Sequence, residues 1–72
     1  MPIVQVNLMQ GRTDAQKKAA AVAITDAVVE TLGVKRESVR VLFHEVGTND
    51  FYAGGITIAE RNAMLAAQAE EN

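Results

Sequence analysis

A long helix framed by two β-branched segments is the feature that most constrains how this chain can fold. Thr13 and Gln16 form a capping-box pattern that predicts a helix start, and Gly33 is a typical helix terminator. Residues 2–9 (PIVQVNLM) and 39–46 (VRVLFHEV) alternate in the two-residue period of strands. A helix of ~20 residues is about 30 Å long, enough to bring the chain back so that both strands run parallel with a right-handed crossover. We therefore predict an α/β fold built on a βαβ unit.

The spacing of side chains indicates which faces of these elements are apolar. The apolar helix positions recur at three- and four-residue steps and are Ala15, Ala19, Val22, Ala23, Val28 and Leu32. The second strand has one face with Val39, Val41, Phe43 and Glu45, and another with Arg40, Leu42, His44 and Val46. Both strand faces are mostly apolar, so each needs a covering layer.

The C-terminal third of the chain is less regular. Residues 47–55 (GTNDFYAGG) are rich in turn-forming residues, so we predict a loop. Residues 56–58 are predicted to form a short edge strand, in a hairpin or on a neighbouring subunit. From residue 60 to 72 the sequence is Ala-rich and favours a helix. We interpret residues 1–72 as a single domain in which the role of the tail, residues 59–72, is open.

One copy of such a chain buries too little surface to be stable alone. The chain has 72 residues and no cysteine, so disulfides cannot reinforce a small core. Parallel sheets are normally covered on both faces, and one helix covers only one of them. We therefore expect this chain to self-associate.

The composition excludes several other classes of site and partner. His44 is the only histidine, and the absence of cysteine leaves no second ligand of either type for a zinc or iron site and no thiol nucleophile. The seven Lys and Arg residues are scattered and the formal net charge is -2, so neither nucleic acid nor an anionic membrane is an expected partner. The apolar stretches are too short to span a membrane, and no secretion signal is apparent. We expect a soluble cytoplasmic protein without a zinc or iron site.

Pro2 is the least ordinary candidate for chemistry. If the initiating Met1 is removed, Pro2 carries a free secondary amine, and the usual pKa of an α-amino group, ~7.7 to 8.0, suits a base near neutral pH. A desolvating pocket with cations nearby would lower this pKa further. Alternatively, Pro2 simply begins an edge strand, where its missing N–H is harmless.

Two arginines and an aromatic residue complete the set of candidates. Arg12 and Arg40 are suited to bidentate hydrogen bonds with carboxylates, although Arg12 taken alone is better interpreted as a solvated loop residue. Arg40 lies on an apolar strand face and needs a partner, either a bound anion or an acid such as Glu45 of another subunit. Phe51 suits an apolar wall over a small ligand or a plug in a subunit contact. We interpret His44 as a packing or interface residue.

Four segments together resemble the 4-oxalocrotonate tautomerase family, a group in the tautomerase superfamily. They are PIVQVNL from Pro2, GRTDAQK from Gly11, SVRV from Ser38 and FYAGG from Phe51, in the expected order and spacing. The resemblance covers about residues 2–58. It implies small βαβ chains, assembled as a homohexamer that is a trimer of dimers, which use an amino-terminal proline as catalytic base and need neither cofactor nor metal.

The resemblance also implies a role for each candidate residue. Pro2 would be the general base, and Arg12 would bind the distal carboxylate of the substrate. Arg40, reaching in from an adjacent subunit, would hold the 2-oxo or 2-hydroxy oxygen and the 1-carboxylate, and Phe51 would supply the apolar wall. The implied reaction is the tautomerisation of a small acidic enol, a 2-hydroxymuconate-like dienol dicarboxylate, to the conjugated ketone (4-oxalocrotonate), as in aromatic hydrocarbon catabolism.

Other functions remain open at this point. One is a non-catalytic oligomeric scaffold or carboxylate-binding protein with the same fold, and another is a promiscuous tautomerase of phenylenolpyruvate-type enols. A decarboxylase of the same superfamily is also compatible with these residues. An amine at Pro2 could in addition attack aldehydes and form an iminium.

Overall fold

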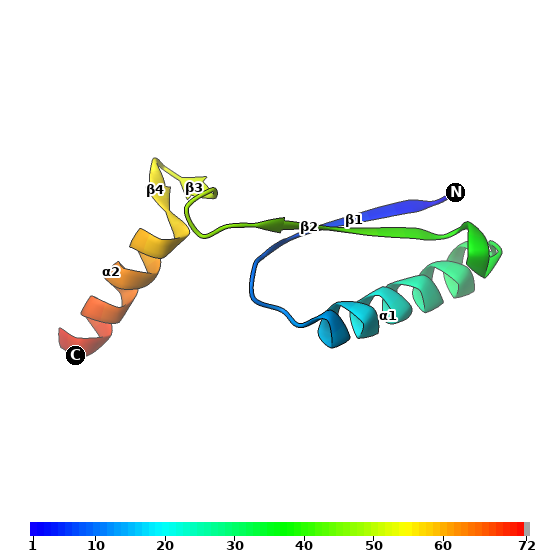
Figure 1. Ribbon diagram of the computed structural model, residues 1–72, viewed down its shortest axis with the longest axis horizontal. Helices are drawn as coiled ribbons and strands as arrows, with labels where there is room; N and C mark the ends of the chain where they lie inside the picture. Colours follow the sequence, from blue (N-terminus) through cyan, green and yellow to red (C-terminus); the bar gives the residue numbers. More distant parts are fainter. Residues whose placement is uncertain (72) are drawn as a thin grey trace.

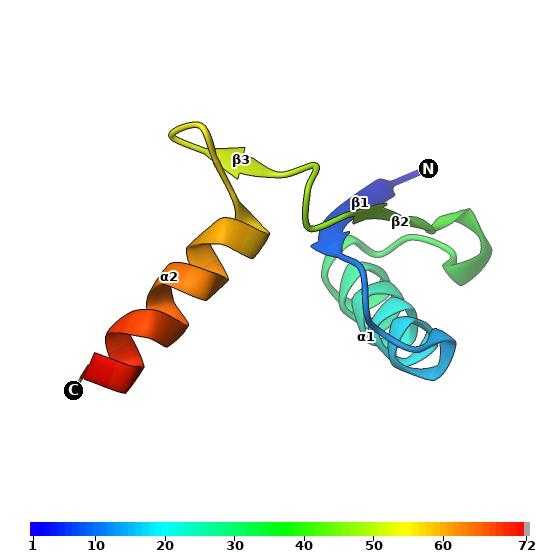
Figure 2. The same ribbon diagram turned by 60° about the vertical axis from the view of Figure 1, so that its left-hand side comes forward.

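The computed structural model describes residues 1–71 as a βαβ unit followed by a hairpin and a second helix. The elements are β1 (Ile3–Met9), α1 (Asp14–Leu32), the short 3-10 helix η1 (Arg36–Ser38), β2 (Arg40–Val46), β3 (Tyr52–Ala53), β4 (Ile56–Thr57) and α2 (Ile58–Glu71). In Figure 1, α1 lies under one face of the β1–β2 ribbon and no other described element covers the opposite face. The hairpin and α2 extend away from this unit, beyond the end of the sheet opposite the N-terminus (Figure 2).

Both ends of α1 are capped as the sequence predicts. The Gln16 backbone N–H donates to Thr13 Oγ1 at 3.1 Å, and the Thr13 N–H donates to Gln16 Oε1 at 2.9 Å. Gly33 adopts φ 66°, a left-handed conformation that favours glycine, and its N–H donates to the Val29 carbonyl. These local signals confirm the predicted helix, which extends from Asp14 to Leu32.

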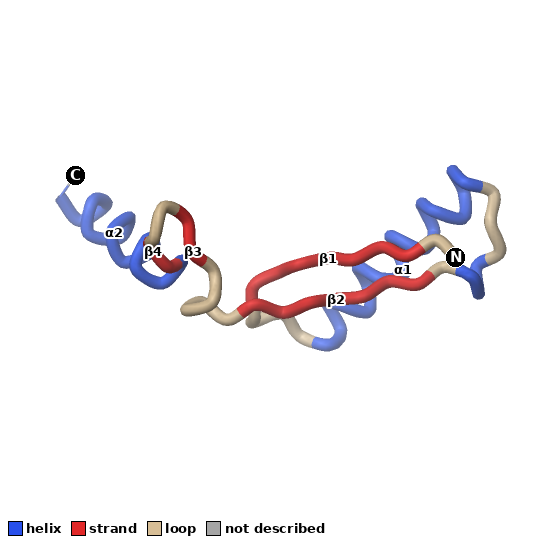
Figure 3. The backbone as a smooth tube through the Cα atoms, turned by 90° about the horizontal axis from the view of Figure 1, so that it is seen from above, coloured by secondary structure: helices blue, strands red, loops and turns tan. Residues whose placement is uncertain are grey.

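Strands β1 and β2 pair in parallel, which confirms the predicted βαβ unit. The register extends from Ile3 opposite Arg40 to Met9 opposite Val46, and Figure 3 shows the two strands side by side. The 3-10 helix η1 was not predicted. It immediately precedes β2, so that strand begins at Arg40, one residue later than predicted.

The helix face that packs on the sheet differs from the predicted apolar series. Its half-buried residues are Lys17, Ala21, Ile24, Thr25, Val28 and Val29. Of the predicted positions only Val28 is among them, whereas Val22 and Leu32 are 40% and 63% exposed. Because alanines make α1 apolar on most of its sides, periodicity alone does not identify the packed face.

An ion pair attaches α1 to β2. Lys17 Nζ lies 2.6 Å from Glu45 Oε1 and 3.5 Å from Asp14 Oδ1. The hydrogen bond to Glu45 is the main cause that raises the pKa of Lys17 above 10.5, while partial desolvation opposes it. Lys17 and Glu45 thereby fix which side of the helix faces the sheet.

Replacing Lys17 with Met should lower the melting temperature more than the control substitution Lys18→Met, because Lys18 has no ion-pair partner among the described side chains. The raised pKa means that the folded protein binds this proton more tightly than the unfolded chain. The stabilisation is therefore complete below pH 10.5 and disappears as the pH rises through the raised pKa. Circular dichroism melts at neutral and strongly alkaline pH test this, and equal melting temperatures for the two variants at neutral pH would contradict it.

The hairpin corrects two predicted boundaries. Tyr52 and Ala53, predicted as loop, form β3 and pair antiparallel with β4 around the turn at Gly54 and Gly55, which both have positive φ. Of the predicted edge strand 56–58, the first two residues form β4, and its pairing with β3 confirms the hairpin alternative.

Helix α2 starts earlier than the Ala-rich tail predicted. It begins at Ile58 because Thr57 Oγ1 accepts a hydrogen bond from the Glu60 N–H at 3.1 Å, as a helix N-cap does. Thr57 is only 5% exposed, so the helix start is held against the hairpin.

The described part of the chain has no fully buried hydrophobic side chain. Its accessible surface is 5534 Å², whereas a compact protein of 7.7 kDa exposes about 4,300 Å². Its radius of gyration is 17.0 Å, against about 11 Å for a compact chain of this length. A single copy therefore leaves much apolar surface in water.

Candidate active site

The predicted site residues lie at opposite ends of the β1–β2 sheet. Pro2 and Arg40 are at one end, where the Arg40 backbone N–H donates to the Pro2 carbonyl at 3.0 Å. Arg12 and Phe51 follow the other ends of β1 and β2, respectively. The seven residues of β1 extend roughly 23 Å. One chain therefore does not bring all four residues into one pocket.

Arg40 also lies on a different face of the sheet from the Pro2 ring. Arg40 pairs with Ile3, and both residues lie on the exposed face of the sheet. Pro2 is half-buried, as are the alternate residues of β1 on the opposite face. Arg40 Nη1 donates to the Glu37 carbonyl at 2.6 Å and forms no ion pair with any described side chain. Glu45, considered above as its intersubunit partner, is held by Lys17 on the opposite face of the sheet.

The Phe51 side chain lines an apolar hollow where the sheet ends. The hollow has a volume of about 200 Å³ and is lined by Asn7, Leu8, Met9, Val46, Phe51 and Ile58. The Ile58 N–H donates to the Phe51 carbonyl at 3.1 Å, which attaches the start of α2 to this loop. Phe51 is still 48% exposed, so another surface can contact its ring. Arg12 is exposed and has no ion-pair partner among the described side chains.

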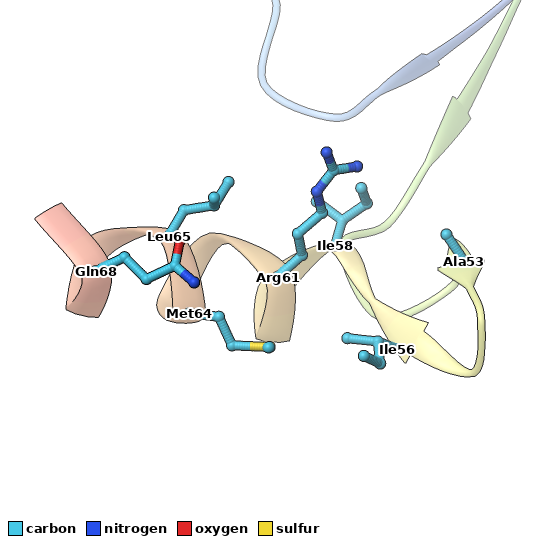
Figure 4. Close-up of a pocket in the computed structure, with 7 residues that line it drawn as sticks. All are labelled: Ala53, Ile56, Ile58, Arg61, Met64, Leu65 and Gln68. Atoms are coloured by element: carbon cyan, nitrogen blue, oxygen red, sulfur yellow. The ribbon is translucent and has the colours of Figure 1, made fainter.

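The structure adds one charged residue that sequence reasoning missed. Arg61 lines an apolar groove of about 330 Å³ next to the Phe51 hollow, between the hairpin and α2 (Figure 4). Its spacing of three residues from Ile58 places both on one helix face. The sequence alone did not reveal this shared face, because α2 begins at Ile58, two residues earlier than predicted.

The described residues contain no cluster of three or more His, Cys, Asp or Glu side chains suited to a metal ion. Over the same part of the chain, neither helix has the length and hydropathy needed to cross a bilayer.

Comparison with known proteins identifies the family. The profile of the family described as "Tautomerase enzyme" matches residues 2–61. A probable tautomerase of Bacillus cereus is 39% identical over 61 residues, which are 85% of this chain and 100% of the relative. The chain belongs to the tautomerase family. Its likeness to these relatives supports an isomerase that catalyses tautomerisation.

Solved structures agree with the fold of this tautomerase. A 4-oxalocrotonate tautomerase isozyme of Methylibium petroleiphilum is 49% identical, with a TM-score of 0.81 over 88% of this chain and 98% of the isozyme. A heterohexameric 4-oxalocrotonate tautomerase of Chloroflexus aurantiacus is 30% identical, with a TM-score of 0.77 over 83% of this chain and 97% of that one. The four predicted site residues and Arg61 all lie within the family match, and residues 62–72 follow it.

Proposed function

We propose that this tautomerase converts a 2-hydroxymuconate-like dienol dicarboxylate to the conjugated ketone, with Pro2 as general base after removal of Met1. The placement of Arg40 carries the proposal. The strand register puts Arg40 at the Pro2 end of the sheet, on an exposed face, as a cation without a carboxylate partner among the described side chains. Such a guanidinium suits the oxygens at which negative charge develops.

The proposed reaction moves one proton. The neutral Pro2 amine takes the proton from the 2-hydroxyl group. The electron pair of that O–H bond forms the C=O π bond of the ketone while the double bonds of the dienol shift. The protonated amine then delivers the proton to a carbon of the dienol, which regenerates the base. Arg40 stabilises the charge on the 2-oxygen and 1-carboxylate, and Arg12 binds the distal carboxylate. Phe51 excludes water, which favours the neutral amine.

The site requires more than one copy of the chain. Arg12 and Phe51 of one copy must meet Pro2 of another, because they lie at the end of the β1–β2 sheet opposite Pro2. The Arg40 side chain projects from the open sheet face, so we assign it to the Pro2 of a neighbour. The surface of one chain exceeds that of a compact monomer by about 1,200 Å², more than the roughly 800 Å² that one partner contributes to a standard interface. A hexamer built as a trimer of dimers provides these contacts, and the heterohexameric relative supports a hexamer.

The wider context follows from this reaction. Residues 1–72 act as one domain, and the family resemblance carries the expectation that such a dienol dicarboxylate arises in aromatic hydrocarbon catabolism. We accordingly place the enzyme in aromatic hydrocarbon catabolism in the cytoplasm.

Intact-mass spectrometry of the purified protein should show a chain that lacks Met1. Met1 is 74% exposed, so a processing enzyme can reach it, and its removal leaves Pro2 with a free secondary amine. While Met1 is attached, the Pro2 nitrogen is an amide with no basic lone pair. An active enzyme that retains Met1 on every chain would contradict the assignment of Pro2 as base, and an inactive protein that retains Met1 would leave carboxylate binding as the function.

A further inference from the structure

Arg61 is a cation without an acidic partner on an apolar surface. Lys17 and Arg36 are paired with Glu45 and Asp26, whereas Arg61 forms no ion pair with any described side chain. The neighbouring Glu60 carboxylate accepts a hydrogen bond from Thr57 Oγ1 at 3.2 Å and forms no ion pair with Arg61. The guanidinium therefore keeps its N–H donors available for an anion.

The Arg61 groove adjoins the hollow that contains Phe51. Ile58 lines both spaces, and its N–H donates to the Phe51 carbonyl. Figure 4 shows the Arg61 and Ile58 side chains next to each other, on the face of α2 turned toward the ends of β1 and β2. Arg61 thus belongs to the same end of the sheet as Arg12 and Phe51.

The groove that Arg61 lines is mostly apolar. Besides the exposed Arg61 it is formed by Ala53, Ile56, Ile58, Met64 and Leu65, with Gln68 as the other polar residue. Arg61 is also carried by a helix whose start is capped by Thr57, which limits the positions its guanidinium can take.

We propose that Arg61 is a specificity-determining residue that binds the distal carboxylate of the substrate together with Arg12. This inference rests on the proposed function, because it concerns the part of the dienol dicarboxylate farthest from Pro2. Two guanidinium groups at this end select substrates with two carboxylates over enols that carry an aromatic ring or an alkyl group in place of the second one.

The test is the substitution Arg61→Met in the full chain, assayed with 2-hydroxymuconate and with phenylenolpyruvate. Loss of a charge-assisted hydrogen bond should lower kcat/KM for the dicarboxylate about 10- to 100-fold, mainly through KM. The value for the monocarboxylate should stay within about twofold, because it has no distal carboxylate to lose. Arg61→Lys should recover part of the loss. Lys35→Met is the matched control, since it removes one positive charge outside both pockets and should change neither value.

Two outcomes would overturn the role of Arg61. One is an equal loss with both substrates, and the other is a change in assembly size of Arg61→Met by sedimentation velocity, which would indicate an interface role. Calorimetric titration with adipate, a non-reacting dicarboxylate, separates this inference from the proposed function. If the wild type is inactive with both enols but binds adipate about tenfold more tightly than Arg61→Met, the reaction is wrong and Arg61 remains a carboxylate ligand. If adipate binds both proteins equally, the inference is wrong whatever the activity.

Discussion

Pro2→Ala should lower kcat for 2-hydroxymuconate about 10²- to 10⁴-fold, the usual contribution of a positioned general base. The pyrrolidine ring fixes the direction of the amine lone pair, and a flexible primary amine at the same place loses this orientation. Stopped-flow absorbance of the dienol and ketone measures the effect. Circular dichroism and sedimentation should match the wild type, because Pro2 precedes β1 and its ring nitrogen donates no hydrogen bond. A variant that turns over within a few-fold of the wild type would show that Pro2 is not the base.

Arg40→Gln should lower kcat/KM about 10²- to 10³-fold, because it removes the cation assigned to the developing charge on the substrate oxygen. Arg36→Gln is the matched control. Arg36 is four residues earlier in the chain and is already paired with Asp26, so its loss should leave turnover unchanged.

Mixing two inactive variants tests where Arg40 acts. If Pro2 and Arg40 of one site come from different copies, assemblies formed jointly from Pro2→Ala and Arg40→Gln chains contain both groups intact at about one site in four. The mixture, refolded together, should regain roughly that share of wild-type activity. If Arg40 serves the Pro2 of its own chain, every mixed site lacks one group. A mixture as inactive as the separate variants would therefore contradict the intersubunit placement.

The parts of the fold that the sequence predicts well are those with local signals. The capping box at Thr13 and the terminator at Gly33 set the ends of α1, and β-branched alternation sets both long strands. The packed face of α1 was not predictable, because alanines make several faces apolar and the Lys17–Glu45 pair joins residues far apart in the sequence. The two-residue strand β3 is too short to show a periodic pattern.

The same distinction, between local sequence signals and properties of the whole fold, applies to the candidate site. The residue types at Pro2, Arg12, Arg40 and Phe51 are compatible with amine and carboxylate chemistry, and the resemblance of four segments to the family assigned the roles. Their distribution over two ends of the sheet depends on the parallel register, which is a property of the fold. The position of Arg61 depends on the Thr57 cap and on the Ile58–Phe51 hydrogen bond, and neither can be read from the Ala-rich tail.

The described residues include no buried hydrophobic side chain, so folding in the cell should depend on protein concentration. A protomer that gains most of its burial from its neighbours cannot separate folding from association, so mass action governs both. Few newly made chains are folded until their concentration is high enough for them to associate. If sites are shared between copies as proposed, catalytic capacity should rise more steeply than expression, because each additional chain also completes the sites of the others.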